Sequence, residues 1–143
     1  MSLEQAIVYT PIEPTLAIRI FSRRYRSSEE DFHLINSELY KRFEYEFDDI
    51  TPLNKRDIEI GYKLFDRELA TKIIMDFQQN RDGRESLLVN CFRGLNRSPA
   101  VAIALNEIFR LGDNTGELKR KYSEANWYVY DMMIKTAERL NIK

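Results

Sequence analysis

The residues best suited to chemistry lie between Leu87 and Ala100, a stretch that contains the only cysteine of the chain. Cys91 is followed by Gly94, Arg97 and Ser98, so that five residues separate the cysteine from the arginine. A cysteine thiolate is a nucleophile, and a guanidinium presents a planar fork of N–H donors that suits two phosphate oxygens. This combination indicates nucleophilic chemistry on an anionic ligand.

The elements around these residues are expected to form an anion site. Leu87-Leu88-Val89 is a short apolar run, typical of a strand buried on both faces of a parallel sheet. The segment 99–111 is apolar nearly all round and predicts a buried helix, with Ser98 as its cap, Pro99 at its first position and Gly112 at its end. A tight loop between strand and helix gathers unpaired N–H groups at the positive end of the helix dipole. Gly94 lets the backbone bend and approach a ligand, and the field favours the thiolate of Cys91.

The Cys, five residues, Arg, Ser pattern resembles the signature of the cysteine-dependent protein tyrosine and dual-specificity phosphatases. Residues 86–112 match the active-site strand, loop and helix of that family. The segment 47–52, Phe-Asp-Asp-Ile-Thr-Pro, resembles its general-acid loop, and 126–133 is similar to a C-terminal segment in which an Asn opens the last helix. The first 40 residues match only in their strand and helix content.

The resemblance implies hydrolysis of a phosphomonoester in two steps, with no metal and no other cofactor. Cys91 would attack phosphorus and form a cysteinyl phosphate, and Asp49 would protonate the leaving oxygen and then activate water. Ser98 would hydrogen-bond to the sulfur and make it a better leaving group. The substrate oxygens would be held by the loop residues Phe92, Arg93, Gly94, Leu95, Asn96 and Arg97. The implied partner is a phosphorylated protein or a small phosphomonoester, with phosphotyrosine favoured and phosphoserine or phosphothreonine left open.

Several assignments within this pattern have alternatives. Asp48 is adjacent to Asp49 and Asp57 follows in the same loop region, so either carboxylate is an alternative acid. Asn126 is either a plain helix cap or a support for the site. Ser98 can serve as a helix cap, as a catalytic hydroxyl or as both.

The chain departs from the family pattern at two positions. Asn90 stands where the family has His, which predicts weaker stabilisation of the thiolate and slower turnover. Asn96 stands where Ser or Gly is usual, and Asn tolerates unusual backbone angles. The alternative function is therefore a phosphate- or phosphopeptide-binding module with little turnover. Sulfur transfer of the rhodanese type is a third hypothesis.

The pattern of apolar and polar residues predicts an α/β fold of one domain, residues 1–143. We expect a partly parallel central sheet of about four or five strands flanked by helices, similar to the protein tyrosine phosphatases. The expected strands are 7–9, 16–21, 43–47 and 87–89. The expected helices are 27–40, whose Ser27 and Glu30 have capping-box spacing, one carrying Phe65 to Phe77, then 99–111, a short charged one after Gly116, and 127–140.

Composition excludes several classes of protein. Hydrophobic residues make up 43% and charged residues 31%, with a net charge of −1, so no electrostatic footprint of a dedicated nucleic-acid binder is present. A single Cys and a single His, His33, exclude an internal disulfide and the common zinc-finger patterns. The apolar runs are too short for a membrane span, and the first residues lack the features of a secretory signal, so we expect a cytoplasmic protein. Arg19, Arg23, Arg24 and Arg26 form a basic cluster that either meets an acidic substrate or lies in solvent. The oligomeric state is left open.

Overall fold

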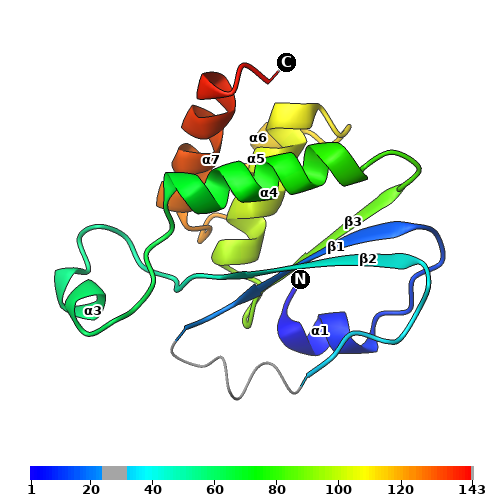
Figure 1. Cartoon of the computed structure of the whole chain (residues 1–143), viewed down its shortest axis with the longest axis horizontal. Coiled ribbons are helices and arrows are strands. Elements are labelled where there is room, and N and C mark those ends of the chain that lie inside the picture. Colours follow the sequence, from blue (N-terminus) through cyan, green and yellow to red (C-terminus); the bar gives the residue numbers. More distant parts are fainter. Residues whose placement is uncertain (24–31, 143) are drawn as a thin grey trace.

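The computed structural model, described here for residues 1–23 and 32–142, has a parallel sheet at its centre (Figure 1). Its strands are β1 (Thr15–Phe21), β2 (Tyr40–Glu46) and β3 (Ser86–Asn90). The order across the sheet is β2-β1-β3, and both neighbouring pairs run parallel. All seven residues of β1 are buried, as expected for a central strand covered on both faces.

Helices cover the two faces of the sheet unequally. Figure 1 shows α1 on one face, and α4, α5, α6 and α7 on the other. The bounds are α1 (Leu3–Val8), α3 (Lys55–Glu59), α4 (Arg67–Asn80), α5 (Arg97–Phe109), α6 (Thr115–Lys121) and α7 (Trp127–Arg139). No helix in the described ranges combines the length and the hydropathy that a membrane crossing needs.

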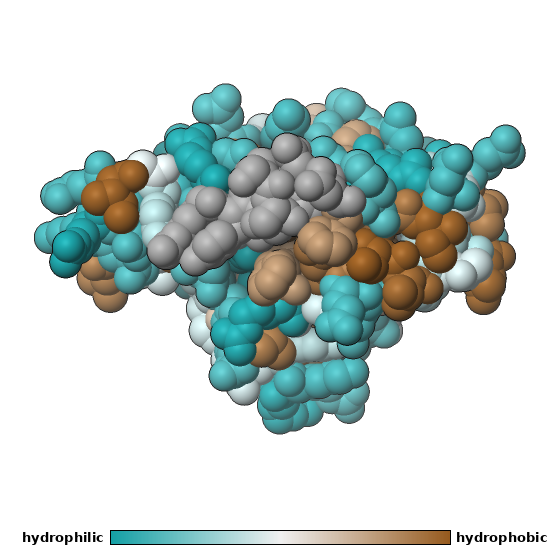
Figure 2. All heavy atoms as spheres, turned by 90° about the horizontal axis from the view of Figure 1, so that it is seen from below, coloured by the Kyte–Doolittle hydropathy of each residue, from teal (hydrophilic) through white to brown (hydrophobic). Residues whose placement is uncertain are grey.

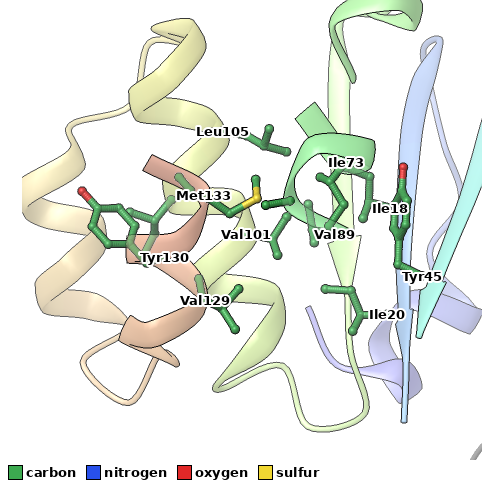
Figure 3. Packing of buried hydrophobic residues seen from close by; sticks show 14 of the residues in the cluster. Ile18, Ile20, Tyr45, Ile73, Val89, Val101, Leu105, Val129, Tyr130 and Met133 are labelled. Atoms are coloured by element: carbon green, nitrogen blue, oxygen red, sulfur yellow. The ribbon is translucent and has the colours of Figure 1, made fainter. Parts of the chain in front are cut away.

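The main hydrophobic core lies between the sheet and α4, α5 and α7 (Figure 3). Ile18 and Ile20 of β1 face Val101 and Leu105 of α5, with Met133 of α7 behind them. A smaller cluster on the α1 side consists of Ala6, Ala17, Leu34, Tyr40 and Leu88. Seen from the α1 side, the surface also carries a group of apolar side chains among the polar ones (Figure 2). β3 and α5, which flank the Cys91 loop, are therefore both fixed by the main core.

The described sheet has three strands rather than four or five, because residues 7–9 do not form a strand. Ile7 and Val8 belong to α1, and Tyr9 is its C-cap. A capping box explains the difference: the Ser2 hydroxyl accepts from the Gln5 N–H, and the Gln5 side chain accepts from the Ser2 N–H. This local cap and the burial of neighbouring apolar residues outweigh the strand preference of two β-branched side chains.

The expected helix 27–40 is wrong where the structure can be compared with it. Residues 24–31, including Ser27 and Glu30, lie outside the described residues, and 32–39 contain no helix. The carbonyl groups of this segment bind strand residues instead. The Ile35 carbonyl accepts from the Arg42 guanidinium, and the Leu39 carbonyl accepts from the Thr15 N–H. The segment is the connection that leads into β2.

The other predicted elements are confirmed, with shifted ends. Phe65 precedes helix α4, which begins at Arg67, and Phe47 follows strand β2, which ends at Glu46. Helix α5 begins at Arg97, and its N-cap is Asn96, whose side chain makes no capping bond. Ser98 therefore lies inside the first turn and is not the cap. The helix ends at Phe109, and its C-cap is Arg110, which adopts the left-handed conformation with φ +53°, two residues before Gly112. The short helix α3 was not predicted.

Candidate active site

Cys91 lies directly after β3, with 2% of its surface exposed and its thiol free. Two backbone donors face its sulfur: the N–H groups of Gly94 and Ser98 donate to Sγ over 3.3 and 3.4 Å. The thiol itself donates to the Ser98 Oγ over 3.2 Å, and the Ser98 hydroxyl donates to the Met1 carbonyl over 3.3 Å. The predicted contact between Ser98 and the sulfur is therefore present.

The loop from Cys91 to Arg97 presents free backbone donors. The N–H groups of Phe92, Arg93, Leu95 and Asn96 make no hydrogen bond to any described residue. The loop runs directly into the N-terminus of α5, a helix of 13 residues. Free backbone donors next to a helix N-terminus are groups that can bind an anion.

Gly94 is required for two reasons, one of which the sequence did not reveal. Its φ of +75° is a left-handed conformation that favours glycine. A Cβ at this position would lie 2.5 Å from the Ser2 nitrogen and 2.7 Å from the Met1 carbonyl carbon. The close approach that we expected of a ligand is made by the first residues of the chain. The Leu3 N–H donates to the Phe92 carbonyl over 3.0 Å, so that this segment is paired with the loop.

Arg97 connects the loop with two other elements. Its side chain is buried, and Nη1 donates to the Ser22 Oγ and to the Phe47 carbonyl, both over 2.9 Å. Its Nε and Nη2 form no hydrogen bond with any described residue. One edge of the guanidinium is thus held by the protein, and the remaining donors are available to an anion. Sequence reasoning missed Ser22, which follows β1 and lies 75 residues from Arg97.

The two neighbouring aspartates have different environments. Asp48 is 4% exposed, and its Oδ2 accepts from the Lys63 N–H over 2.7 Å while its own N–H donates to the Lys63 carbonyl. Asp49 is exposed. The buried carboxylate shapes the loop, and the exposed one is accessible to a substrate. Asp57, the other candidate, lies in α3.

Asn126 serves both of the roles that the sequence left open. Its Oδ1 accepts from the Val129 N–H and caps α7. Its Nδ2 donates to the Asp49 Oδ1 over 2.9 Å and to the Ile50 carbonyl over 3.2 Å. Its backbone N–H donates to the carbonyl of Asn96 in the loop over 2.9 Å. One residue therefore contacts the loop 47–52, the loop from Cys91 to Arg97 and the last helix.

The two positions that depart from the family pattern differ in their contacts. Asn96 has φ −118°, which any residue adopts, so unusual backbone angles do not explain it. Its Nδ2 donates to the Glu124 carbonyl over 2.6 Å instead. Asn90 is 1% exposed, and its Oδ1 has no hydrogen-bond partner among the described residues. Asn90 stands opposite Arg19 in the sheet.

Other residues singled out in the sequence lie apart from this chemistry. His33 is exposed and lies in the non-helical segment 32–39. Arg19 is buried and donates to the Phe32 carbonyl, and Arg23 pairs with Glu46 over 2.9 Å. Arg24 and Arg26 lie outside the described residues. No group of three or more potential metal-binding side chains occurs within the described ranges.

Comparison with solved structures relates this geometry to a known fold. The crystal structure of Tk-PTP in the active form matches with a TM-score of 0.54 over 96% of this chain and 87% of that chain, at 16% sequence identity. The chain has a protein tyrosine phosphatase-like fold. A human tyrosine phosphatase-like serine/threonine/tyrosine-interacting protein matches with a TM-score of 0.48 and 18% identity, over 98% of this chain and 87% of that chain. No protein-family model and no curated protein matches the sequence.

Proposed function

We propose that the protein hydrolyses phosphomonoesters through a cysteinyl-phosphate intermediate on Cys91, with phosphotyrosine in proteins as the favoured substrate. The observation that carries the proposal is the pair of backbone N–H groups, of Gly94 and Ser98, that donate to the Cys91 sulfur. These donors lie in the same loop as the free N–H groups and next to the free edge of Arg97. A nucleophile and an oxyanion site are thus provided by one segment.

In the first step, the loop N–H groups and Arg97 bind the non-bridging oxygens of the phosphate. The Cys91 sulfur attacks phosphorus, and the bond from phosphorus to the leaving oxygen breaks. Asp49 gives its proton to that oxygen, so that the product leaves as a neutral alcohol or phenol. Charge on the transferring phosphoryl group is stabilised by donors that are already in place.

In the second step, water attacks the phosphorus of the cysteinyl phosphate. Asp49 accepts a proton from the water, the sulfur–phosphorus bond breaks, and inorganic phosphate forms. The sulfur leaves as a thiolate, which the N–H groups of Gly94 and Ser98 stabilise. The Ser98 hydroxyl, 3.2 Å from the sulfur, turns from the Met1 carbonyl to donate to this thiolate.

The surface of the loop supports phosphotyrosine as the substrate class. Phe92 is 56% exposed and Leu95 is 37% exposed, although both side chains are apolar. An aromatic ring attached to the bound phosphate gains contact with such side chains, whereas the short side chains of phosphoserine and phosphothreonine offer less apolar area.

Phosphate release from p-nitrophenyl phosphate in the presence of a chelator tests the proposal. We expect turnover by the wild-type protein and a loss of at least about a thousandfold in Cys91→Ser, because serine supplies no thiolate. Circular dichroism of both proteins controls for folding. Equal turnover by the two proteins would refute the proposal.

The environment of Asn90 favours a second candidate, a phosphate-binding module with little turnover. Its buried Oδ1 has no partner among the described residues, at the position where the family has His. Folded wild-type protein that binds phosphate but does not release it from an ester would identify this function.

A further inference from the structure

We propose that Asn126 is a positioning residue for the general acid, and that its amide determines which oxygen of Asp49 carries the transferred proton. The inference rests on the proposed function. It starts from the hydrogen bond between the Asn126 Nδ2 and the Asp49 Oδ1, which joins residues 77 apart in the sequence.

The orientation of the Asn126 amide follows from its three partners. Its oxygen faces a donor, the Val129 N–H, over 3.2 Å. Its nitrogen faces two acceptors, the Asp49 carboxylate and the Ile50 carbonyl. A flipped amide would place an oxygen against two acceptors and an NH₂ group against a donor, so only one orientation satisfies all three contacts.

This orientation makes the two oxygens of Asp49 unequal. Oδ1 accepts an N–H from Asn126 and therefore acts as the acceptor oxygen of the carboxyl group. In the acid form, Oδ2 therefore carries the proton, and Oδ2 gives this proton to the leaving oxygen in the first step. After that transfer, the bond from Asn126 becomes charge-assisted and stabilises the carboxylate that has formed. In the second step, Oδ2 accepts the proton from the attacking water.

The same residue relates the acid to the phosphate loop. The Asn126 N–H donates to the Asn96 carbonyl over 2.9 Å, and the Asn96 side chain donates to the Glu124 carbonyl over 2.6 Å. The start of α7 is therefore joined to the loop by two hydrogen bonds. Because Asn126 is only 8% exposed, water competes poorly for the hydrogen bonds that Asn126 itself makes. The side chain of Asn126 thus fixes the position of the Asp49 carboxylate relative to the loop from Cys91 to Arg97.

Leaving-group dependence separates this role from a purely structural one. We would compare kcat/KM for phenyl phosphate, whose leaving oxygen needs a proton, with kcat/KM for p-nitrophenyl phosphate, whose leaving group needs one much less. Asn126→Asp keeps an acceptor for the Val129 N–H and removes the donor to Asp49. Asn126→Ser also keeps a capping side chain, without introducing a second carboxylate.

The chain provides a matched control in Asn114. This residue caps α6 through its Oδ1, which accepts from the Glu117 N–H over 2.9 Å, and it is exposed. We expect both Asn126 variants to lower kcat/KM for phenyl phosphate by about ten- to a hundredfold, and for p-nitrophenyl phosphate by much less. Asn114→Asp and Asn114→Ser should leave both values at the wild-type level.

Different results would overturn the inference and the proposed function. If the wild-type protein is active, Asn126 variants whose kcat/KM falls equally for both substrates, or for neither, would overturn the positioning role alone. A wild-type protein that hydrolyses neither substrate would overturn the proposed function and this inference with it.

Discussion

At the scale of single residues, the acid loop shows how neighbouring side chains take different roles. The chain bends at Asp49, where the Ile50 N–H donates to the Asp48 carbonyl over 3.0 Å. Asp48 is buried and its carboxylate accepts from the Lys63 backbone N–H, whereas Asp49 is exposed and accepts from Asn126. The sequence favoured Asp49 by resemblance, and the difference in burial gives a physical reason for that choice.

Replacing each aspartate by its amide tests this division. Asp49→Asn should lower kcat/KM for phenyl phosphate by about a hundredfold or more, because the amide has no proton to give to the leaving oxygen. Asp48→Asn keeps an acceptor for the Lys63 N–H and should stay within a few-fold of wild type. Rate profiles across pH 5–8 measure both effects, and the opposite result would assign the acid to Asp48.

The residues of the Cys91 loop were predicted from the sequence more completely than the residues that bind them from other elements. Cys91, Gly94, Arg97 and Ser98 lie in one short segment, so their types and spacing indicate a site directly. Ser22 and Asn126 reach the site from elements 75 and 77 residues away from their partners. Such contacts depend on how the elements pack, which spacing along the chain does not encode.

At the scale of elements, the proposed phosphate-binding loop from Cys91 to Arg97 is hydrogen-bonded on both sides. The first residues of the chain pair with Cys91 and Phe92, and the start of α7 binds the Asn96 carbonyl. The capping box of α1, Ser2 with Gln5, was readable in the sequence and would have replaced the expected strand 7–9 by a helix. Its position against the loop was not readable, because it results from pairing with a strand end nearly 90 residues later.

Comparing Gly94 with Gly83 measures the effect of the close approach between the Met1–Ser2 backbone and the loop from Cys91 to Arg97. Gly94 and Gly83 both have φ +75°, but a Cβ at Gly83 would meet nothing within 4 Å. Gly83→Ala should therefore lower the free energy of unfolding by only about 1 to 2 kcal/mol, the penalty of the left-handed conformation. Gly94→Ala should lower it clearly more and also reduce turnover, because the backbone of Met1 and Ser2 must move. Urea unfolding compares the two variants, and equal losses would argue against the close approach.

At the scale of the whole molecule, the α/β class and the phosphatase-like architecture were predictable. The apolar runs in β1 and β3 and the helical spacing in α4 and α7 indicate buried parallel strands and amphipathic helices. The number of strands was overestimated because a run of three apolar residues, 7–9, fits either type of element. The likeness to Tk-PTP at 16% identity is consistent with this, since a pattern of buried positions can persist when most residues differ.

The central claim is that Cys91 becomes phosphorylated during turnover. The most direct measurement mixes the whole protein with p-nitrophenyl phosphate, quenches the reaction with acid within milliseconds, and locates added phosphate by mass spectrometry of peptides. We expect a phosphate on the peptide that contains Cys91, and none on that peptide in Cys91→Ser or in samples quenched after the substrate is consumed. Turnover without phosphate on Cys91, or with phosphate on another residue, would contradict it.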